Sequence, residues 1–384
     1  MNICVITAAY PYEDSIDGVF VREQCRALSK KGHHVAVLAA LGRGGIAQGP
    51  AFDYAEEDGF CCYISRCFRK ATTYFPTIAS KVVLRQISTL FDTCYKDGCM
   101  PDVLYAHFAF PAGYAACEFG KERSLPVVVM EHFSGIAQGT TRKGCDRIIR
   151  DTINAADSFY CVSDGLKRAL DRLNPSGKQI GVIPDMISDF YHFIPSREKE
   201  EYVFFSLGVL RKIKGFDVLI KAFCSAFSGN ERVRLRIGGA GEEGVFLRGM
   251  IKKLGREHQI EMLGALDSDT ALYEYGICDC FVLASRCETF GIVYREAMAC
   301  GRPVISTRNG GIEQGWKDDF GLLVDVDDID ALAKAMQEMR HSRDKYDFEN
   351  ISSQTLKLYS PEVVSNEISK ALERVVLEGG RRLS

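Results

Sequence analysis

The chain has 384 residues, of which 46% are hydrophobic and 26% charged, and its formal net charge at pH 7 is −3. This length exceeds what one ordinary hydrophobic core holds, so two domains are expected. Without a basic excess, the composition gives no reason to expect nucleic-acid binding. No apolar run approaches the length that spans a bilayer.

The fifteen cysteines are scattered through apolar segments, and only Cys61 and Cys62 are adjacent. No C-x-x-C pair occurs, so the sequence indicates no metal site of that kind. Buried free thiols are typical of a reducing compartment. Residues 2–7 have the character of a strand and lack the basic start of a signal peptide. A cytosolic protein is therefore expected, with peripheral attachment to the inner face of the membrane as an alternative.

Strands and helices alternate through the first half of the chain. Residues 3–9 and 35–38 have the composition of buried strands, and between them a helix is expected that ends at Gly32. Further apolar runs follow at residues 103–106, 127–130 and 159–162. Runs that are apolar on both faces and separated by helices indicate a parallel sheet covered on both sides.

A second alternation begins at Tyr202, after a charged, proline-containing segment (residues 187–201) that is predicted as a linker. The sequence therefore predicts an α/β protein with two Rossmann-like, doubly wound domains that face each other across a cleft. In such sheets, ligands bind at the carboxyl ends of the strands. The chain is expected to divide into an acceptor-side domain (residues 1–188) and a donor domain (residues 189–358). A final helix (residues 359–384) is expected to pack back on the first domain.

Residues 59–91 contain no Asp or Glu, and five basic residues lie there among aromatic and aliphatic ones. On a helix, this mixture can lie on an anionic membrane surface. The alternative is a solvated cationic face over ordinary core residues, and both interpretations stay open. The basic residues are Arg66, Arg69, Lys70, Lys81 and Arg85.

The strongest motif is a strand–turn–helix–strand unit at residues 280–311, whose helix is expected from about Phe290 to Gly301. Glu288 lies in the turn and Glu296 on the helix, with seven residues between them. Amides at a helix start can bind phosphate, and carboxylates accept hydrogen bonds from hydroxyls. The unit suits a sugar nucleotide, although acids near a helix start are also common for purely electrostatic reasons.

The same unit, SRCETFGIVYREAMACGRPVIS followed by NGG, resembles the donor site of the family-four retaining glycosyltransferases. Those enzymes have the two-Rossmann-domain GT-B fold and a Glu-x7-Glu motif in this context. The resemblance covers nearly the whole chain in the right order. Further matching segments are residues 18–24, 102–108, 128–132, 214–215 and 321–324.

In the second domain, the resemblance implies that Glu296 binds the ribose hydroxyls of the nucleotide. It implies that Glu288 holds hydroxyls of the transferred sugar near the reacting carbon. Lys214 would neutralise the departing diphosphate, a role that fits its charge. The backbone amides that would contact sugar and phosphate are those of Phe290, Gly291 and Ile292.

In the first domain, the resemblance implies that Gly18 lets the first loop approach the diphosphate. It also implies that His132 touches the sugar, and His132 is the best candidate for a general base. Glu288, His132 and Lys214 are thus the predicted catalytic residues. Val209 departs from the family, which usually has arginine there, and Arg211 is the predicted donor-binding replacement.

Two other motifs compete with this interpretation. Residues 239–244 form G-x-G-x-x-G after a strand, as in dinucleotide-binding proteins. Glu242 and Glu243 would sit where the pyrophosphate must lie, so a simple turn is preferred. The D-x-D pairs at residues 267–269 and 325–327 resemble metal ligands, but both lie beside helix starts, where capping is the commoner role.

The sequence predicts a retaining glycosyltransferase that moves a hexose or related sugar from a nucleotide-diphosphate sugar to a hydroxyl of a glycan or lipid-linked acceptor. Synthesis of cell-surface polysaccharide or glycoconjugate is the expected setting. No cofactor, no essential metal and no nucleic-acid partner are expected; residues 59–91 are the candidate contact with an anionic membrane. The alternatives are a sugar-nucleotide epimerase or hydrolase of the same fold and a non-catalytic sugar-nucleotide-binding module.

Overall fold

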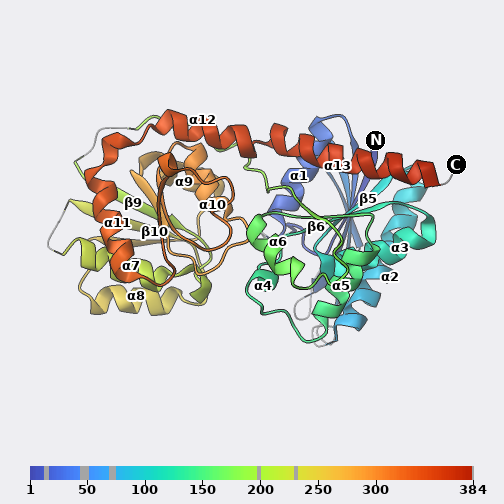
Figure 1. Cartoon of the computed structure of the whole chain (residues 1–384), viewed down its shortest axis with the longest axis horizontal. Coiled ribbons are helices and arrows are strands. Elements are labelled where there is room, and N and C mark those ends of the chain that lie inside the picture. Colours follow the sequence, from blue (N-terminus) through green and yellow to red (C-terminus); the bar gives the residue numbers. More distant parts are fainter. Residues whose placement is uncertain (13–16, 44–51, 69–74, 197–199, 229–231, 383–384) are drawn as a thin grey trace. The chain divides into compact units, whose positions relative to one another are not determined.

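The structure, a computed structural model, describes all residues except 13–16, 44–51, 69–74, 197–199, 229–231 and 383–384. It divides the chain into two compact units (Figure 1). Unit 1 comprises Met1–Met186 and Pro361–Ser384, and unit 2 comprises Ile187–Ser360. These divisions lie within two residues of the expected ones. None of the helices in the described ranges combines the length and the apolar character needed to cross a membrane.

The sheet of unit 1 has eight strands in the order β3-β4-β2-β1-β5-β6-β7-β8. All neighbouring strands run parallel except β3 and β4. The order reverses between β1 and β5, which is where doubly wound sheets place ligands. The strands are β1 (Asn2–Thr7), β2 (His34–Arg43), β3 (Phe52–Glu57), β4 (Phe60–Phe68), β5 (Val103–His107), β6 (Val127–Glu131), β7 (Ser158–Cys161) and β8 (Ile180–Val182).

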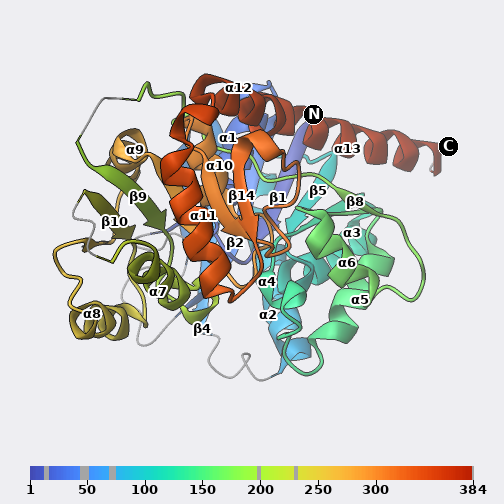
Figure 2. The ribbon, with the colours of Figure 1, turned by 60° about the vertical axis from the view of Figure 1, so that its left-hand side comes forward.

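Helices cover both faces of this sheet. Figures 1 and 2 show α1 and α13 over one face and α2 and α3 over the other. These bury apolar stripes at helical spacing, such as Val21, Cys25 and Leu28 of α1. The helices are α1 (Val19–Lys30), α2 (Pro76–Lys96), α3 (Tyr114–Arg123), α4 (Ser134–Ala137), α5 (Cys145–Ala155), α6 (Asp164–Asp171) and α13 (Pro361–Arg382), with a short helical turn η1 (Ala109–Gly113) before α3.

The last helix, α13, packs against α1, β5 and β6 of unit 1. Its buried side chains recur at helical spacing: Val364, Ile368, Ala371, Leu372 and Val375. The ring Nε2 of His33 lies 2.9 Å from the Ser369 hydroxyl. His33 therefore has a structural role, in line with its place in a turn before β2.

The segment at residues 59–91 is not one helix. Its first part is strand β4 and its last part belongs to α2. Arg66 is buried on β4, with its guanidinium 4.8 Å from the centre of the Tyr12 ring. The helical interpretation was wrong for this part, because β4 pairs with β2 on one side and with β3 on the other. Arg69 and Lys70 lie outside the described residues.

The sheet of unit 2 is wholly parallel, with the order β11-β10-β9-β12-β13-β14. Its order reverses between β9 and β12. The strands are β9 (Tyr202–Leu207), β10 (Val233–Gly238), β11 (Ile260–Gly264), β12 (Cys280–Leu283), β13 (Val304–Thr307) and β14 (Gly321–Val324). The helices are α7 (Phe216–Ala226), α8 (Gly244–Lys253), α9 (Ser268–Ile277), α10 (Ile292–Ala299), α11 (Ile329–His341) and α12 (Phe348–Tyr359), with short turns η2 (Lys212–Lys214), η3 (Asp318–Phe320) and η4 (Arg343–Lys345).

The glycine-rich motif at residues 239–244 connects β10 to α8. A Cβ at Gly239 would lie 1.9 Å from the carbonyl oxygen of Gly208, and one at Gly241 would lie 2.6 Å from that of Leu210. These glycines let the turn pack closely on the loop after β9. Packing on protein backbone explains them without a dinucleotide.

Candidate active site

The candidate site of unit 2 is built on the loops that follow β9 and β12, on either side of the point where the strand order reverses. Gly215 joins the two loops. It has a φ of 66°, and a Cβ there would lie 1.9 Å from the Ala284 carbonyl oxygen. The Arg286 amide also donates to the Ile213 carbonyl at 2.7 Å. Only glycine fits at position 215, so the turn carrying Lys214 is held against the turn carrying Glu288.

Lys214 and Glu288 form an ion pair in which Lys214 Nζ lies 2.6 Å from Glu288 Oε1. The Ser285 hydroxyl donates to the same oxygen at 2.7 Å. The Glu288 side chain is 9% exposed, and that of Lys214 is 24% exposed. A cation and an anion therefore lie together at the carboxyl end of the sheet. The sequence predicted each residue but not this contact.

The helix start that follows Glu288 offers backbone donors. Gly291 is the N-cap of α10, with a φ of 78° and no side-chain cap. Within the described part of the chain, the amides of Phe290, Gly291 and Ile292 have no protein acceptor. Unpaired amides at a helix start bind anions such as phosphate. The expected helix start at Phe290 is two residues too early.

Asn309 connects the turn that carries Glu288 to the turn that follows β13. Its carbonyl oxygen accepts from the Glu288 amide at 3.0 Å, and its side-chain Oδ1 accepts from the amides of Gly311 and Ile312 at 3.1 and 3.2 Å. The Glu313 carboxylate accepts from the Gly310 amide at 2.9 Å. Sequence reasoning missed Asn309 and Glu313, although Asn-Gly-Gly after a strand is a turn signal.

Arg295 is fully buried under the site, with 1% of its surface exposed. Its guanidinium donates to the carbonyl oxygens of Gly311 at 2.9 Å and Gln314 at 3.0 Å, and also to that of Phe290. It lies 4.1 Å from the centre of the Phe290 ring. One side chain thus ties the start of α10 to the turn after β13. No sequence signal predicts this role, since Arg295 looks like any helix-surface cation.

Replacing Arg295 by methionine is expected to destabilise the protein by about 3–5 kcal/mol, because several buried carbonyl oxygens would lose a charged donor together. Urea unfolding of the two proteins measures the difference. The exposed Arg248→Met variant is the matched control and should stay within about 0.5 kcal/mol of the parent. Equal stability of the Arg295 and Arg248 variants would contradict the tethering role.

Glu296 lies one turn into α10, where the Tyr275 hydroxyl donates to its Oε2 at 3.0 Å. Burial raises the pKa of Glu296 to about 7 from an ordinary value of 4.5, and the bond from Tyr275 opposes this rise. Tyr275 is itself completely buried. The Glu296 carboxyl group therefore gains or loses its proton near neutral pH. The hydrogen bond from the buried Tyr275 side chain holds it in one orientation.

The arginine position of the family holds Val209, which is 42% exposed. Arg286 does not replace the missing charge, because it pairs with Asp217 at 3.0 Å and Asp327 at 2.8 Å. Arg211 is exposed directly before η2, the turn that carries Lys214. Arg211 therefore stays the predicted replacement.

In unit 1, Gly18 begins α1 with a φ of 81°, and a Cβ there would lie 2.3 Å from the Ala9 carbonyl oxygen. Only glycine allows this approach to the loop after β1. Phe20, in the first turn of α1, lies with its ring centre 4.4 Å from that of His132. The structure thus brings the start of α1 and His132 together at the carboxyl end of the unit 1 sheet.

His132 has protein partners at both ring nitrogens. Its Nδ1 lies 3.2 Å from Asp185 Oδ1, and its Nε2 lies 3.1 Å from His107 Nδ1. Gln24 donates to the same Asp185 oxygen at 3.2 Å and accepts from the Tyr105 hydroxyl at 2.7 Å. Both ring nitrogens of His132 therefore lie within hydrogen-bonding distance of another side chain.

Glu131 fixes the backbone around His132. Its buried carboxylate accepts from the amides of Ala109, His132 and Phe133 at 2.8, 2.8 and 2.7 Å. Burial raises the pKa of Glu131, and these three amides oppose the rise. The loops after β5 and β6 are thereby joined at one carboxyl group.

Each of the two D-x-D pairs contains an acid with a structural partner. Asp267 caps α9 by accepting from the Thr270 amide at 2.8 Å, and Asp327 pairs with Arg286. Across the described ranges, no group of three or more His, Cys, Asp or Glu side chains is placed to hold a metal ion.

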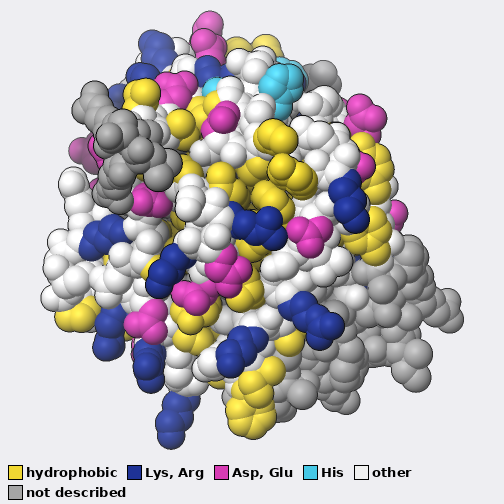
Figure 3. All heavy atoms as spheres, turned by 90° about the vertical axis from the view of Figure 1, so that its right-hand side faces the viewer, with side chains coloured by type: hydrophobic (Ala, Val, Ile, Leu, Met, Phe, Trp, Pro, Cys, Tyr) yellow, Lys and Arg dark blue, Asp and Glu magenta, His cyan; other side chains and the backbone are white. Residues whose placement is uncertain are grey.

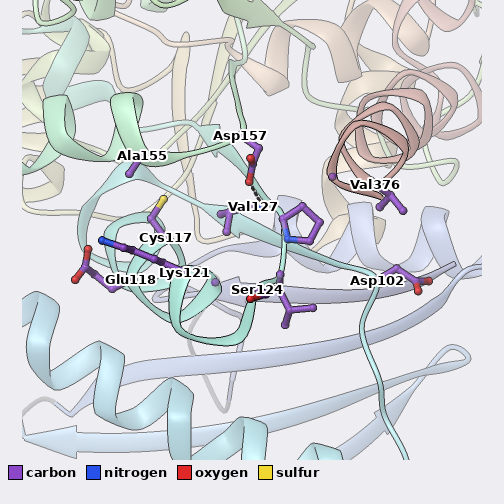
Figure 4. A pocket seen from close by; sticks show the side chains of 13 residues that line it. Asp102, Cys117, Glu118, Lys121, Ser124, Val127, Ala155, Asp157 and Val376 are labelled. Atoms are coloured by element: carbon purple, nitrogen blue, oxygen red, sulfur yellow. Dashed lines mark hydrogen bonds between the residues drawn. The ribbon is translucent and has the colours of Figure 1, made fainter. Parts of the chain in front are cut away.

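A separate cavity of about 670 Å³ lies at the opposite, amino-terminal ends of β5, β6 and β7 (Figure 4). Its lining includes Lys121 of α3 and Val376 of α13. Asp157, also in the lining, already accepts from the Val127 amide at 2.9 Å. Because ligands of doubly wound sheets bind at the carboxyl ends, this cavity is not the candidate site.

The fold and the site at its strand ends define a GT-B glycosyltransferase architecture. The model of Glycosyltransferase Family 4 matches residues 18–189, and that of Glycosyl transferases group 1 matches residues 188–351. The chain therefore belongs to the family-four glycosyltransferases, and the resemblance seen in the sequence is confirmed.

Solved structures share the fold over nearly the whole chain. Sucrose-phosphate synthase from Thermosynechococcus elongatus has a TM-score of 0.79 at 18% identity and covers 98% of this chain and 100% of its own. Anabaena HepE, solved in complex with UDP and glucose, has a TM-score of 0.72 at 14% identity and covers 97% and 100%. The predicted fold class is thus confirmed.

Curated relatives match over shorter stretches. N-acetyl-alpha-D-glucosaminyl L-malate synthase of Bacillus anthracis is 28% identical over 245 residues, 60% of this chain and 63% of its own length. One subunit of the phosphatidylinositol N-acetylglucosaminyltransferase of Arabidopsis thaliana is 26% identical over 249 residues, 61% and 54% respectively. The match thus spans between half and two thirds of these relatives.

Proposed function

We propose that this chain is a retaining, metal-independent glycosyltransferase that uses a nucleotide-diphosphate sugar. The observation that carries the proposal is the Lys214–Glu288 pair beside the unpaired amides at the start of α10. Lys214 and the amides would stabilise the charge that develops on the departing diphosphate. Glu288 would accept hydrogen bonds from hydroxyls of the transferred sugar, and Glu296 from those of the ribose.

The transfer step breaks the bond between the sugar carbon and the diphosphate oxygen and forms a bond to the acceptor oxygen on the same face of the sugar. The acceptor proton passes to the departing phosphate oxygen. This assignment is supported by the two ring nitrogens of His132, each of which already has another side chain within hydrogen-bonding distance. In the proposal, Gly18 and His132 keep the donor contacts that the resemblance implies.

A thermal-shift panel of nucleotide sugars tests the function, because a ligand that binds only the folded state raises the melting temperature. UDP-N-acetylglucosamine, UDP-glucose and GDP-mannose are the first probes, chosen because relatives and similar structures carry these groups in their names. We expect one donor to give a clear shift and transfer with retained configuration. Free sugar released without any acceptor would favour an epimerase or hydrolase instead.

Asp185→Ala is expected to lower kcat by about 10- to 100-fold with little change in donor KM, because the His132 ring would lose its fixed orientation. Asp185→Asn keeps an acceptor for Gln24 and His132 and should retain most of the activity. Steady-state kinetics and the ¹⁵N shifts of the His132 ring provide the two measurements. An Asp185→Ala enzyme with parental kcat would contradict the positioning role.

We also propose that the acceptor is a lipid-linked glycan met at an anionic membrane surface. Ile78, Lys81 and Arg85 are exposed on one face of α2, at helical spacing. On the face of the molecule in Figure 3, Lys and Arg side chains lie among Asp and Glu side chains.

Replacing Lys81 and Arg85 together by alanine is expected to weaken binding to phosphatidylglycerol-containing vesicles by about 10- to 30-fold, at about 1 kcal/mol for each basic side chain. Cosedimentation at low salt measures the bound fraction. The matched control replaces Lys334 and Lys357, which are exposed in unit 2. Equal losses in both double variants would indicate only general charge attraction.

A further inference from the structure

Two cysteines meet where helix α2 ends. The helix stops at Lys96, Asp97 is its C-cap, and Gly98 follows with a φ of 88°. The Cys99 amide donates to the Cys94 carbonyl at 3.1 Å, and the Gly98 amide donates to the Tyr95 carbonyl at 3.0 Å. This pair of bonds defines a Schellman motif, which commonly brings together the side chains at the positions that Cys94 and Cys99 occupy. The helix ending itself therefore sets two thiols side by side.

The two thiols have different surroundings. Cys94 is 2% exposed, whereas Cys99 is partly exposed in the loop. The Cys94 thiol donates a hydrogen bond to the Cys99 sulfur, which lowers the pKa of Cys99 and raises that of Cys94. Cys99 is thus the thiol that solvent reaches and that ionises first, with Cys94 held beside it as a second sulfur. Such a pair has the features of an oxidisable dithiol.

We propose that Cys94 and Cys99 form a modification site, a dithiol that hydrogen peroxide converts to an intramolecular disulfide. The Cys99 thiolate attacks one peroxide oxygen, the O–O bond breaks, and Cys99 becomes a sulfenic acid while hydroxide leaves. Cys94 sulfur then attacks the Cys99 sulfur; the S–S bond forms as the sulfenic oxygen departs as water. The two thiols are oxidised by two electrons and one peroxide is reduced to two waters.

The backbone of the motif favours this closure. The hydrogen bond from the Cys99 amide to the Cys94 carbonyl keeps the two residues next to each other in the folded chain. Both residues belong to unit 1, and β1 places a third thiol, that of Cys4, near the pair. The proposal does not depend on the glycosyltransferase function, because neither cysteine belongs to the candidate active site.

The test uses the full reduced chain, treated with a small excess of hydrogen peroxide and then with an alkylating reagent. We expect the peptide that contains both cysteines to lose two hydrogen atoms and to escape alkylation until dithiothreitol is added. The disulfide between Cys94 and Cys99 should form at least about 10-fold faster than Cys224, a partly exposed thiol of unit 2, is oxidised. The experiment on the parent protein needs no variant to fold.

Two single variants sharpen the result. In Cys94→Ser, Cys99 should stop at the sulfenic acid or go on to the sulfinic acid, because no second sulfur closes the bond. In Cys99→Ser, Cys94 should remain a reduced thiol under the same treatment. Oxidation of Cys99 no faster than Cys224, or a disulfide from Cys99 to any cysteine other than Cys94, would overturn the proposal.

Discussion

Replacing Glu288 by glutamine is expected to lower kcat by about 100- to 1,000-fold, the range seen when one preorganised charge or donor is removed from a reacting centre. The amide keeps an oxygen that can accept from Lys214 and Ser285, as the carboxylate does at 2.6 and 2.7 Å. The change therefore removes the negative charge while the local geometry is retained. Initial rates of sugar transfer at saturating donor measure the effect.

The control for this prediction is Glu242→Gln, which removes an exposed acid from the same unit. That variant should transfer sugar at the parental rate. If the Glu288→Gln protein keeps kcat within about threefold of the parent, Glu288 does not act in the reaction. If it binds the donor normally but does not transfer, the loss lies in the chemical step and not in folding.

Donor binding is expected to weaken about tenfold for each pH unit below 7, because ribose hydroxyls would donate to an ionised Glu296 carboxylate. The pKa of Glu296 is raised to about 7 by burial. Below that pH the group holds a proton that must leave when the nucleotide binds. Above about pH 8 the affinity should be constant. Titration calorimetry in two buffers of different ionisation enthalpy should show about one proton released at pH 6.

The same pKa predicts a stability change with a definite sign. Between pH 4.5 and 7 the folded protein holds a proton on Glu296 that the unfolded chain releases, so this contribution to stability is complete at low pH and is lost as the pH rises through about 7. At pH 8 the ligand-free Glu296→Gln variant should therefore be more stable than the parent by up to about 3 kcal/mol. It should bind nucleotide poorly and without pH dependence.

Two results would show whether the ribose role or the raised pKa of Glu296 is wrong. If Glu296→Gln leaves nucleotide affinity unchanged, the ribose role is wrong whatever the pH profile shows. If affinity falls but the parent shows no pH dependence between 6 and 8, the ribose role stands and the Glu296 carboxyl group of the free protein is already ionised at pH 6.

Local sequence patterns were sufficient for the architecture of both units. The apolar run at residues 281–284 predicted the buried strand β12, because a strand covered on both faces has few polar positions. Gly301, with a φ of 83°, ends helix α10 as expected, since glycine adopts that conformation without strain. Such signals act over a few residues, and they do not require knowledge of distant parts of the chain.

The same patterns gave a wrong prediction where a segment was compatible with both the helical and the strand period. Residues 59–91 mix basic and apolar side chains in a way that fits a helix or a strand. The sheet decided between them, because β4 pairs with β2 on one side and β3 on the other. Arg66 was interpreted as a surface cation, yet its stem and guanidinium are buried against Tyr12.

Short motifs were enough to identify the family, the two doubly wound units and the main candidate residues. How those residues act together depends on contacts that arise only in the folded chain. Lys214 and Glu288, 74 positions apart, meet because Gly215 lets their two loops touch. The buried Arg295 and the doubly bonded His132 likewise owe their roles to partners brought by other strands. The spacing of apolar residues along the chain determines whether a segment forms a helix or a strand. Which loops come into contact depends on the order of the strands in the sheet.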